Sequence, residues 1–272
     1  MTILHSRITG TPASTGPGPR SIVLLGALGS SVDMWTPLQD ILTGSPGDTS
    51  PHLIALDLRG HGASPLPAGP VVEGVTRISD LAEDVLETLD ALGSGPVDLV
   101  GLSIGGAVAQ HLAAHRPDMV RTLTLMCTAP AFGDPEDWTT RATSVRARGI
   151  DTLRELAEST VLRWFTAGFR DARPATTLAV ADMITRTTPA GYAACCDALS
   201  TFNGNDLLPL ITAPTLTVAG THDPTCPPEI LAAMNSAVPT AVRHLVLDGA
   251  HLLPVECPQQ VADALLEHWA AH

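Results

Sequence analysis

Short apolar runs alternate with helical patterns along most of the chain. Between the apolar runs, hydrophobic residues recur every three or four positions, as at residues 78–92, which is typical of an amphipathic helix. Strands that alternate with helices predict an α/β fold built on a doubly wound, mostly parallel sheet. The runs with the length of buried parallel strands lie at residues 21–25, 52–56, 97–100, 122–127, 215–219 and 243–247.

The middle of the chain has a different pattern. Residues 130–209 contain no strand candidate, so we expect a core of residues 1–129 and 210–272 with a helical cap inserted at 130–209. Ligands of such sheets bind at the carboxyl ends of the strands, where a cap would cover them. The helices predicted within the insertion lie at residues 136–148, 152–164, 175–186 and 189–199.

The strongest chemical signal is the segment Gly101-Leu-Ser103-Ile-Gly105, which follows the strand at 97–100 and opens a helical run. A serine on a sharp turn between a strand and a helix is the arrangement of a nucleophile elbow. Glycine on both sides allows the tight backbone that such a turn requires. The pattern predicts Ser103 as a catalytic nucleophile, and its structural alternative is a plain glycine-rich turn.

Two backbone amides complete this expectation. The amide of Ile104, at the start of the helix, and that of Leu28, in the turn after residues 21–25, are the predicted donors to an oxyanion. A dinucleotide-binding loop is disfavoured, because Ser103 stands where the middle glycine of that motif must be.

A serine nucleophile needs a histidine base, and the histidine needs a carboxylate that fixes its orientation. In this architecture the three follow the chain order serine, acid, histidine. Asp223 follows the strand at 215–219 and His251 follows the strand at 243–247, so we expect them to be the acid and the base. The competing candidates nearby are His222, Asp248 and Glu256.

Charge and composition exclude several classes of function. All 15 basic residues are arginine, which rules out a lysine Schiff base and the lysine of a phosphate-binding loop. The formal charge of -13 argues against a nucleic-acid partner. Residues 130–209 carry a net charge of only -2, against -11 for the remainder, so an anionic substrate meets less repulsion near them.

Cysteines, histidines and hydropathy predict a cytoplasmic protein without membrane, metal or cofactor. The 5 cysteines are odd in number and lack metal-site spacing, so we expect reduced thiols. There is no signal-peptide pattern and no apolar run long enough to cross a bilayer. His111 and His115 lie four apart without a third ligand, and we interpret them as packing residues.

Together with the elbow, the segment Asp57-Leu-Arg-Gly-His61-Gly-Ala-Ser64 resembles the α/β-hydrolase family over nearly the whole chain. The resemblance implies an α/β-hydrolase fold and a serine hydrolase that needs no cofactor. It also implies that this loop is structural, so that His61 is not catalytic.

The predicted cap is similar to that of one branch, the 3-oxoadipate enol-lactonases of aromatic catabolism (the beta-ketoadipate pathway). This resemblance implies that the substrate is a small enol-lactone with a carboxylate, opened through an acyl-enzyme, and that Trp138 lines the pocket. Gly26 and Ala131 depart from the polar and basic residues of the branch, so Arg141 becomes the candidate partner of the carboxylate. The blocks that carry the likeness are residues 101–110, 133–138, 163–166 and 188–197.

Two other functions remain open at this point. The same machinery fits a carboxylesterase or another lactonase, whose substrate is also a small molecule. A hydrolase fold kept as a non-catalytic small-molecule binder is disfavoured, since a receptor has no need of a complete serine, acid and histidine set.

Overall fold

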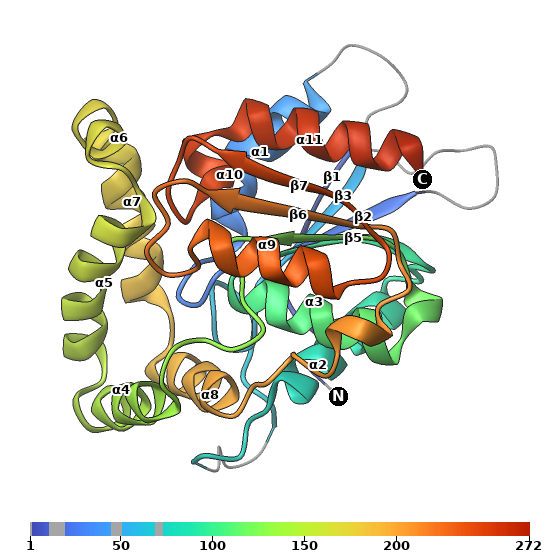
Figure 1. The fold of residues 1–272 in the computed structure, drawn as a ribbon. Helices are drawn as coiled ribbons and strands as arrows, with labels where there is room; N and C mark the ends of the chain where they lie inside the picture. Colours follow the sequence, from blue (N-terminus) through green and yellow to red (C-terminus); the bar gives the residue numbers. More distant parts are fainter. Residues whose placement is uncertain (1, 11–19, 45–50, 69–72) are drawn as a thin grey trace.

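The computed structural model describes residues 2–10, 20–44, 51–68 and 73–272, and its centre is a seven-stranded sheet (Figure 1). The strand order is β1-β3-β2-β4-β5-β6-β7, and every neighbouring pair is parallel except β1 with β3. The predicted, mostly parallel sheet is therefore confirmed. Its strands are β1 (Ser6–Thr9), β2 (Ser21–Leu25), β3 (His52–Leu56), β4 (Val97–Leu102), β5 (Val120–Met126), β6 (Thr215–Gly220) and β7 (Ala241–Leu247).

Strand β1 is the one the apolar pattern did not predict. It has four residues, Ser-Arg-Ile-Thr, of which Ile8 is exposed and the rest are half-buried. The strand lies at the edge of the sheet and pairs only with β3. An edge strand needs little apolar surface, so it lacks the hydrophobic run that marks buried strands.

Helices cover both faces of the sheet (Figure 1). Helices α1 and α11 lie on one face, and α2, α3 and α9 lie on the other, which gives the doubly wound arrangement. The helices of this part are α1 (Thr36–Thr43), α2 (Ile78–Ala91), α3 (Ile104–His115), α9 (Pro228–Ala237), α10 (Leu253–Glu256) and α11 (Pro258–Ala271), with short 3-10 turns η1 (Val32–Trp35), η2 (Pro117–Met119) and η3 (Leu208–Leu210).

The chain between β5 and β6 forms a group of helices beyond one end of the sheet (Figure 1). Helix α4 packs against α8, and α5 packs against α7. Of these helices, only the short α6 had no counterpart among the sequence expectations. Their bounds are α4 (Pro135–Arg148), α5 (Ile150–Trp164), α6 (Ala167–Ala172), α7 (Pro174–Arg186) and α8 (Pro189–Ser200).

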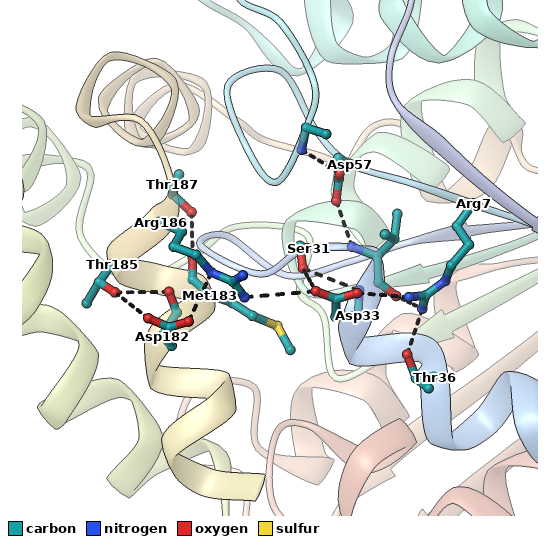
Figure 2. Close-up of polar contacts among 12 residues, drawn as sticks. Arg7, Ser31, Asp33, Thr36, Asp57, Asp182, Met183, Thr185, Arg186 and Thr187 are labelled. Carbon is teal, nitrogen blue, oxygen red and sulfur yellow. Dashed lines mark hydrogen bonds and ion pairs between the residues drawn. The ribbon is translucent and has the colours of Figure 1, made fainter.

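Polar contacts join the end of α7 to the rest of the molecule. Figure 2 shows Arg186 between Asp182 of its own helix, 3.1 Å away, and Asp33 of η1, 3.9 Å away. Asp33 also accepts a hydrogen bond from Arg7 of β1. The amide of Thr188 donates to the carbonyl of Gly60 at 2.9 Å. These contacts link the end of α7 and the start of α8 to η1 and to the loop at Gly60.

The centre of the sheet forms the interior of the protein. All residues of β2, β4 and β6 are buried, whereas β7 at the edge is mostly half-buried or exposed. Burial of a leucine or valine side chain contributes about 1.5–3 kcal/mol to the stability of the fold. The central strands are therefore firmly packed, and the turns that follow them start from fixed positions. No helix among the described residues is both long and apolar enough to span a bilayer.

Candidate active site

Ser103 lies in a strained turn between β4 and α3. Its backbone has φ 57° and ψ -122°, a conformation that residues other than glycine rarely adopt. A Cβ atom added to Gly101 would lie 2.4 Å from the carbonyl oxygen of Gly105, and one added to Gly105 would lie 2.3 Å from that of Leu25. Glycine is therefore required at both positions, and the turn directs the serine away from the strand.

Neighbouring strands hold this turn in place. The amide of Ser103 donates to the carbonyl of Met126 at 3.1 Å, and the Ser103 carbonyl accepts a 2.7 Å hydrogen bond from Thr128 Oγ1. The amide of Gly105 donates to the carbonyl of Gly26 at 3.1 Å. Contacts to the ends of both β2 and β5 thus stabilise a backbone that would otherwise relax.

Asp223 and His251 form a buried pair. Asp223 Oδ2 lies 2.7 Å from His251 Nδ1, and both side chains are at most 1% exposed. The other carboxylate oxygen accepts hydrogen bonds from the amides of Thr225 at 2.8 Å and Cys226 at 3.1 Å. The acid is therefore fixed by the backbone after β6, and it in turn orients the imidazole.

Ser103 and His251 line the same cavity, which has a volume of about 120 Å³. The described residues include no hydrogen bond between the serine hydroxyl and the imidazole. Hydrogen bonds between catalytic side chains often tighten only when substrate binds, so shared access to one cavity is the relevant observation. The ring of Trp164 is tilted by 30° relative to the histidine ring, with 5.9 Å between ring centroids, and it also lines the cavity.

Two backbone amides are free at this end of the sheet. Ile104 is the first residue of α3, and Leu28 lines the cavity in the turn after β2. Within the described ranges, neither amide donates a hydrogen bond. Free N–H groups beside a serine hydroxyl, one of them at a helix N-terminus, are suited to stabilise a negatively charged oxygen.

Helices α4, α5 and α8 supply the opposite wall of the cavity. The Arg141 guanidinium lies 4.6 Å from the centre of the Trp138 ring, and Arg163 donates to Thr160 Oγ1 at 3.2 Å. Burial, with the nearby charge of Arg141, lowers the pKa of Arg163. Burial also raises the pKa of Tyr192 well above its usual range, so that its phenol stays protonated. The wall combines aromatic surface with two cations.

These two arginines differ from others of the chain. Arg59 and Arg146 each form an ion pair with a buried carboxylate, that of Asp84 or Asp197. No ion pair is found for Arg141 or Arg163 in the part of the chain that the structure describes. Two half-buried cations that share one cavity without a carboxylate repel each other, and an anionic ligand would relieve this cost.

Comparison with known proteins agrees with this geometry. Residues 20–258 match the family model of the alpha/beta hydrolase fold. The chain belongs to the alpha/beta hydrolase family. It is thus a hydrolase enzyme with the fold that the sequence predicted.

Among the alpha/beta hydrolases, this chain is similar to enol-lactonases. It is 32% identical to 3-oxoadipate enol-lactonase 2 of Acinetobacter baylyi, over 88% of this chain and 84% of that protein. The enol-lactonase structure from Burkholderia xenovorans has a TM-score of 0.88 at 30% identity, covering 99% and 97% of the two chains. A thermophilic esterase from Thermogutta terrifontis, solved with malate bound, has a TM-score of 0.84 at 28% identity, covering 98% and 93%.

The competing acids and bases have other partners in this hydrolase. His222 Nε2 lies 3.0 Å from Asp248 Oδ1 on the surface, where both side chains are more than half exposed. Glu256 accepts hydrogen bonds from the amides of Ala250 at 2.9 Å and Thr166 at 3.0 Å. It holds the segment just before His251 and links it to the helical insertion, a positioning role that the sequence did not suggest.

The remaining histidine candidates lie outside the cavity lined by Ser103 and His251. His61 is fully buried, its Nδ1 lies 3.0 Å from the carbonyl of Arg59, and burial lowers its pKa, which favours the neutral ring. The rings of His111 and His115 stack with centroids 4.2 Å apart, and the His115 ring bonds to the His111 carbonyl at 3.0 Å.

Sequence reasoning missed several residues of the cavity wall. Thr160, Arg163 and Trp164 lie three and four positions apart on α5, so they share the helix face that lines the cavity. Tyr192 lines the same cavity from α8. Both Arg163 and Tyr192 fall inside the blocks that resemble enol-lactonases. That resemblance, with the helical spacing on α5, was the signal from which they could have been found.

Proposed function

We propose that this hydrolase opens a small lactone that carries a carboxylate, and that 3-oxoadipate enol-lactone is its substrate. The observation that carries the proposal is the pair of arginines without a carboxylate partner, Arg141 and Arg163, in the cavity of Ser103. The similarity to enol-lactonases supports the same substrate. An arginine is well suited to bind a carboxylate, because its planar N–H groups match the two oxygens.

In the proposed reaction, Ser103 attacks the lactone carbonyl while His251 Nε2 accepts the hydroxyl proton. Asp223 keeps the other ring proton on Nδ1 and stabilises the imidazolium. The negative charge that develops on the carbonyl oxygen is stabilised by the amides of Leu28 and Ile104. These roles follow from the pairing at 2.7 Å and from the free amides beside the serine.

Collapse of this intermediate breaks the ring bond between the acyl carbon and the enol oxygen. The leaving enolate takes the proton from the His251 imidazolium, and the resulting enol converts to a ketone, which makes the step effectively irreversible. Water then attacks the acyl-Ser103 ester, with His251 again accepting a proton, and the free acid and the serine are released.

We further propose that residues 130–209 act as a cap domain on a core of residues 1–129 and 210–272. Trp138 from α4 and Arg163 from α5 lie in the same cavity as Ser103, so the insertion supplies the groups that select the substrate.

The cysteines support a place of action for the enzyme. Among the described residues all five cysteines are free, which supports action in the reducing cytoplasm.

The test compares the enol-lactone with its neutral methyl ester on the wild-type enzyme and on Arg163→Gln. A charged hydrogen bond is worth about 1.5–3 kcal/mol, so the KM for the carboxylate substrate should rise roughly 10- to 100-fold in the variant. The neutral ester should react almost equally with both enzymes. Arg173→Gln removes the same charge from an exposed position outside the cavity and serves as the matched control.

Other outcomes of this assay, or of labelling Ser103 with a fluorophosphonate, would favour the competing functions. Strong preference of the wild-type enzyme for neutral aryl esters would indicate a carboxylesterase. Failure of a fluorophosphonate to label Ser103 would indicate a non-catalytic binding protein. Equal loss of activity on both substrates in Arg163→Gln would show that this arginine stabilises the fold instead of binding a carboxylate.

A further inference from the structure

A buried thiol adjoins the pair of Asp223 and His251. Cys127 follows β5 with a left-handed backbone, φ 43°, and its amide donates to the carbonyl of Val218 at 2.9 Å. This turn brings its thiol beside the segment before the histidine, 3.8 Å from the carbonyl of Ala250. The Cys127 sulfur, a carboxylate oxygen of Asp223 and a ring nitrogen of His251 all lie within 4.8 Å of one another.

These atoms are the three kinds of ligand that zinc binds in proteins. Zinc lies about 2.0–2.3 Å from such atoms, so two ligands of a tetrahedral ion are roughly 3.5 Å apart. Small side-chain movements would bring the trio to that spacing. A thiolate and a carboxylate together cancel the charge of a divalent ion, which removes the main cost of burying it.

We propose that Cys127, Asp223 and His251 form a binding site for a thiophilic divalent cation, Zn²⁺ or Cd²⁺, whose occupation inhibits the enzyme. The inhibitory part rests on the proposed function of the serine and histidine. Of the three residues only His251 lines the cavity, and Cys127 and Asp223 are buried behind it, so the ion has to enter past the imidazole. The neighbouring Cys226 donates to Asp223 through its backbone amide, and its thiol is not one of the three grouped ligands.

The inhibition follows from the position of one proton. The ion binds His251 Nδ1 in place of the hydrogen bond to Asp223, and the ring proton moves from Nδ1 to Nε2. The Cys127 thiol loses its proton to solvent as the sulfur binds the ion. With Nε2 protonated, the imidazole has no lone pair left to accept the proton of Ser103, and the nucleophile is not activated.

The experiment titrates Cd²⁺ into wild-type protein, Cys127→Ala and His111→Gln. Binding is followed by the ultraviolet charge-transfer band of a cadmium-bound thiolate, which does not depend on activity. Labelling of Ser103 by a fluorophosphonate reports inhibition in the same samples. The His111→Gln control breaks up the histidine pair of α3, whose ring centroids lie 4.2 Å apart and which is a candidate competing site for the ion.

Wild-type protein and His111→Gln should bind one equivalent of Cd²⁺, show the band and lose labelling. Cys127→Ala should lose the band, and its labelling should resist at least roughly 10- to 100-fold more Cd²⁺, since loss of even an outer partner weakens metal sites that much. Cys127→Ser keeps the size of the side chain and should behave as Cys127→Ala does.

An unchanged band in both Cys127 variants, or no band in the wild-type protein, would overturn the proposed site. If the band appears while Ser103 is never labelled, the metal site stands and the proposed catalytic function fails. If the band appears and labelling is unaffected by Cd²⁺, the proposed inhibition is wrong. The two readouts therefore separate the failure of this inference from the failure of the proposed reaction.

Discussion

Among the described residues, two of the histidine–aspartate pairs have the same local geometry but different surroundings. In both, the histidine Nδ1 lies 2.7 Å from an aspartate Oδ2: His251 with Asp223, and His5 with Asp57. Both aspartates also accept hydrogen bonds from backbone amides. Distance alone therefore does not distinguish a proposed catalytic pair from a structural one.

What differs is access to a nucleophile. His251 is buried and lines the cavity that Ser103 also lines. The His5 side chain is 40% exposed, and the nearby Ser64 hydroxyl donates to the carbonyl of Asp57, which is labelled in Figure 2. The Asp57 carboxylate joins η1 to the loop of residues 57–64 through the amides of Val32 and Ala63. His5 and Asp57 also line a cavity, of about 180 Å³, but Ser64 does not share it. The strained turn that places Ser103 in the same cavity as His251, not the pair or a cavity by itself, marks the candidate active site.

The largest expected effect is the difference in kcat between replacing Ser103 and replacing Ser64. Ser103→Ala should reduce kcat by about six orders of magnitude, because serine and histidine act as a unit in such enzymes. Ser64→Ala should leave kcat close to the wild-type value and lower only stability. Steady-state hydrolysis of the enol-lactone measures both, and a Ser103→Ala protein with wild-type turnover would contradict the proposed mechanism.

The next comparison replaces each aspartate by asparagine. Asp223→Asn should reduce kcat about 10⁴-fold, because the imidazole is then held in the wrong tautomer. Asp57→Asn should leave kcat nearly unchanged and lower the free energy of unfolding by about 2 kcal/mol, since hydrogen bonds to a charged group are lost. Kinetics and urea denaturation of both variants test this contrast. Similar kinetic losses in the two would show that the pairs are not functionally distinct.

A smaller effect concerns the neutral histidine of the structural loop. Burial lowers the pKa of His61 below its usual 6.5, so the unfolded chain binds a proton that the folded chain excludes. The stability that this provides is complete above pH 6.5 and decreases as the pH falls below it, by up to about 1.4 kcal/mol per pH unit. His61→Asn should reduce this slope in urea denaturation between pH 7 and pH 5, and an identical slope in both proteins would exclude the effect.

The smallest expected effect belongs to His5. His5→Gln removes one of the hydrogen bonds to Asp57 but leaves those from the amides of Val32 and Ala63. We expect a loss of about 1 kcal/mol in unfolding free energy and no change in kcat. Thermal denaturation and the kinetic assay measure the two quantities. A large kinetic effect would indicate that this pair communicates with the cavity.

Local sequence could predict the elbow because its requirements are local. Gly101 and Gly105 are needed by the backbone around Ser103 itself, and the apolar run before them is a strand that is buried on both faces. The roles of Arg163 and Cys127 could not be predicted in this way. Which face of α5 meets the cavity, and which thiol lies beside Asp223, depend on packing between elements that are far apart in the chain.

The sequence by itself determined the alternation of strands and helices, the strained serine turn and the order in which serine, acid and histidine follow one another. These features are set by short-range periodicity and by backbone constraints within a few residues. Only the tertiary structure decided that Asp223 binds His251 while Asp248 binds His222, and that two arginines share a cavity without a carboxylate. Such pairings depend on how whole strands and helices are placed, and no local pattern encodes those distances.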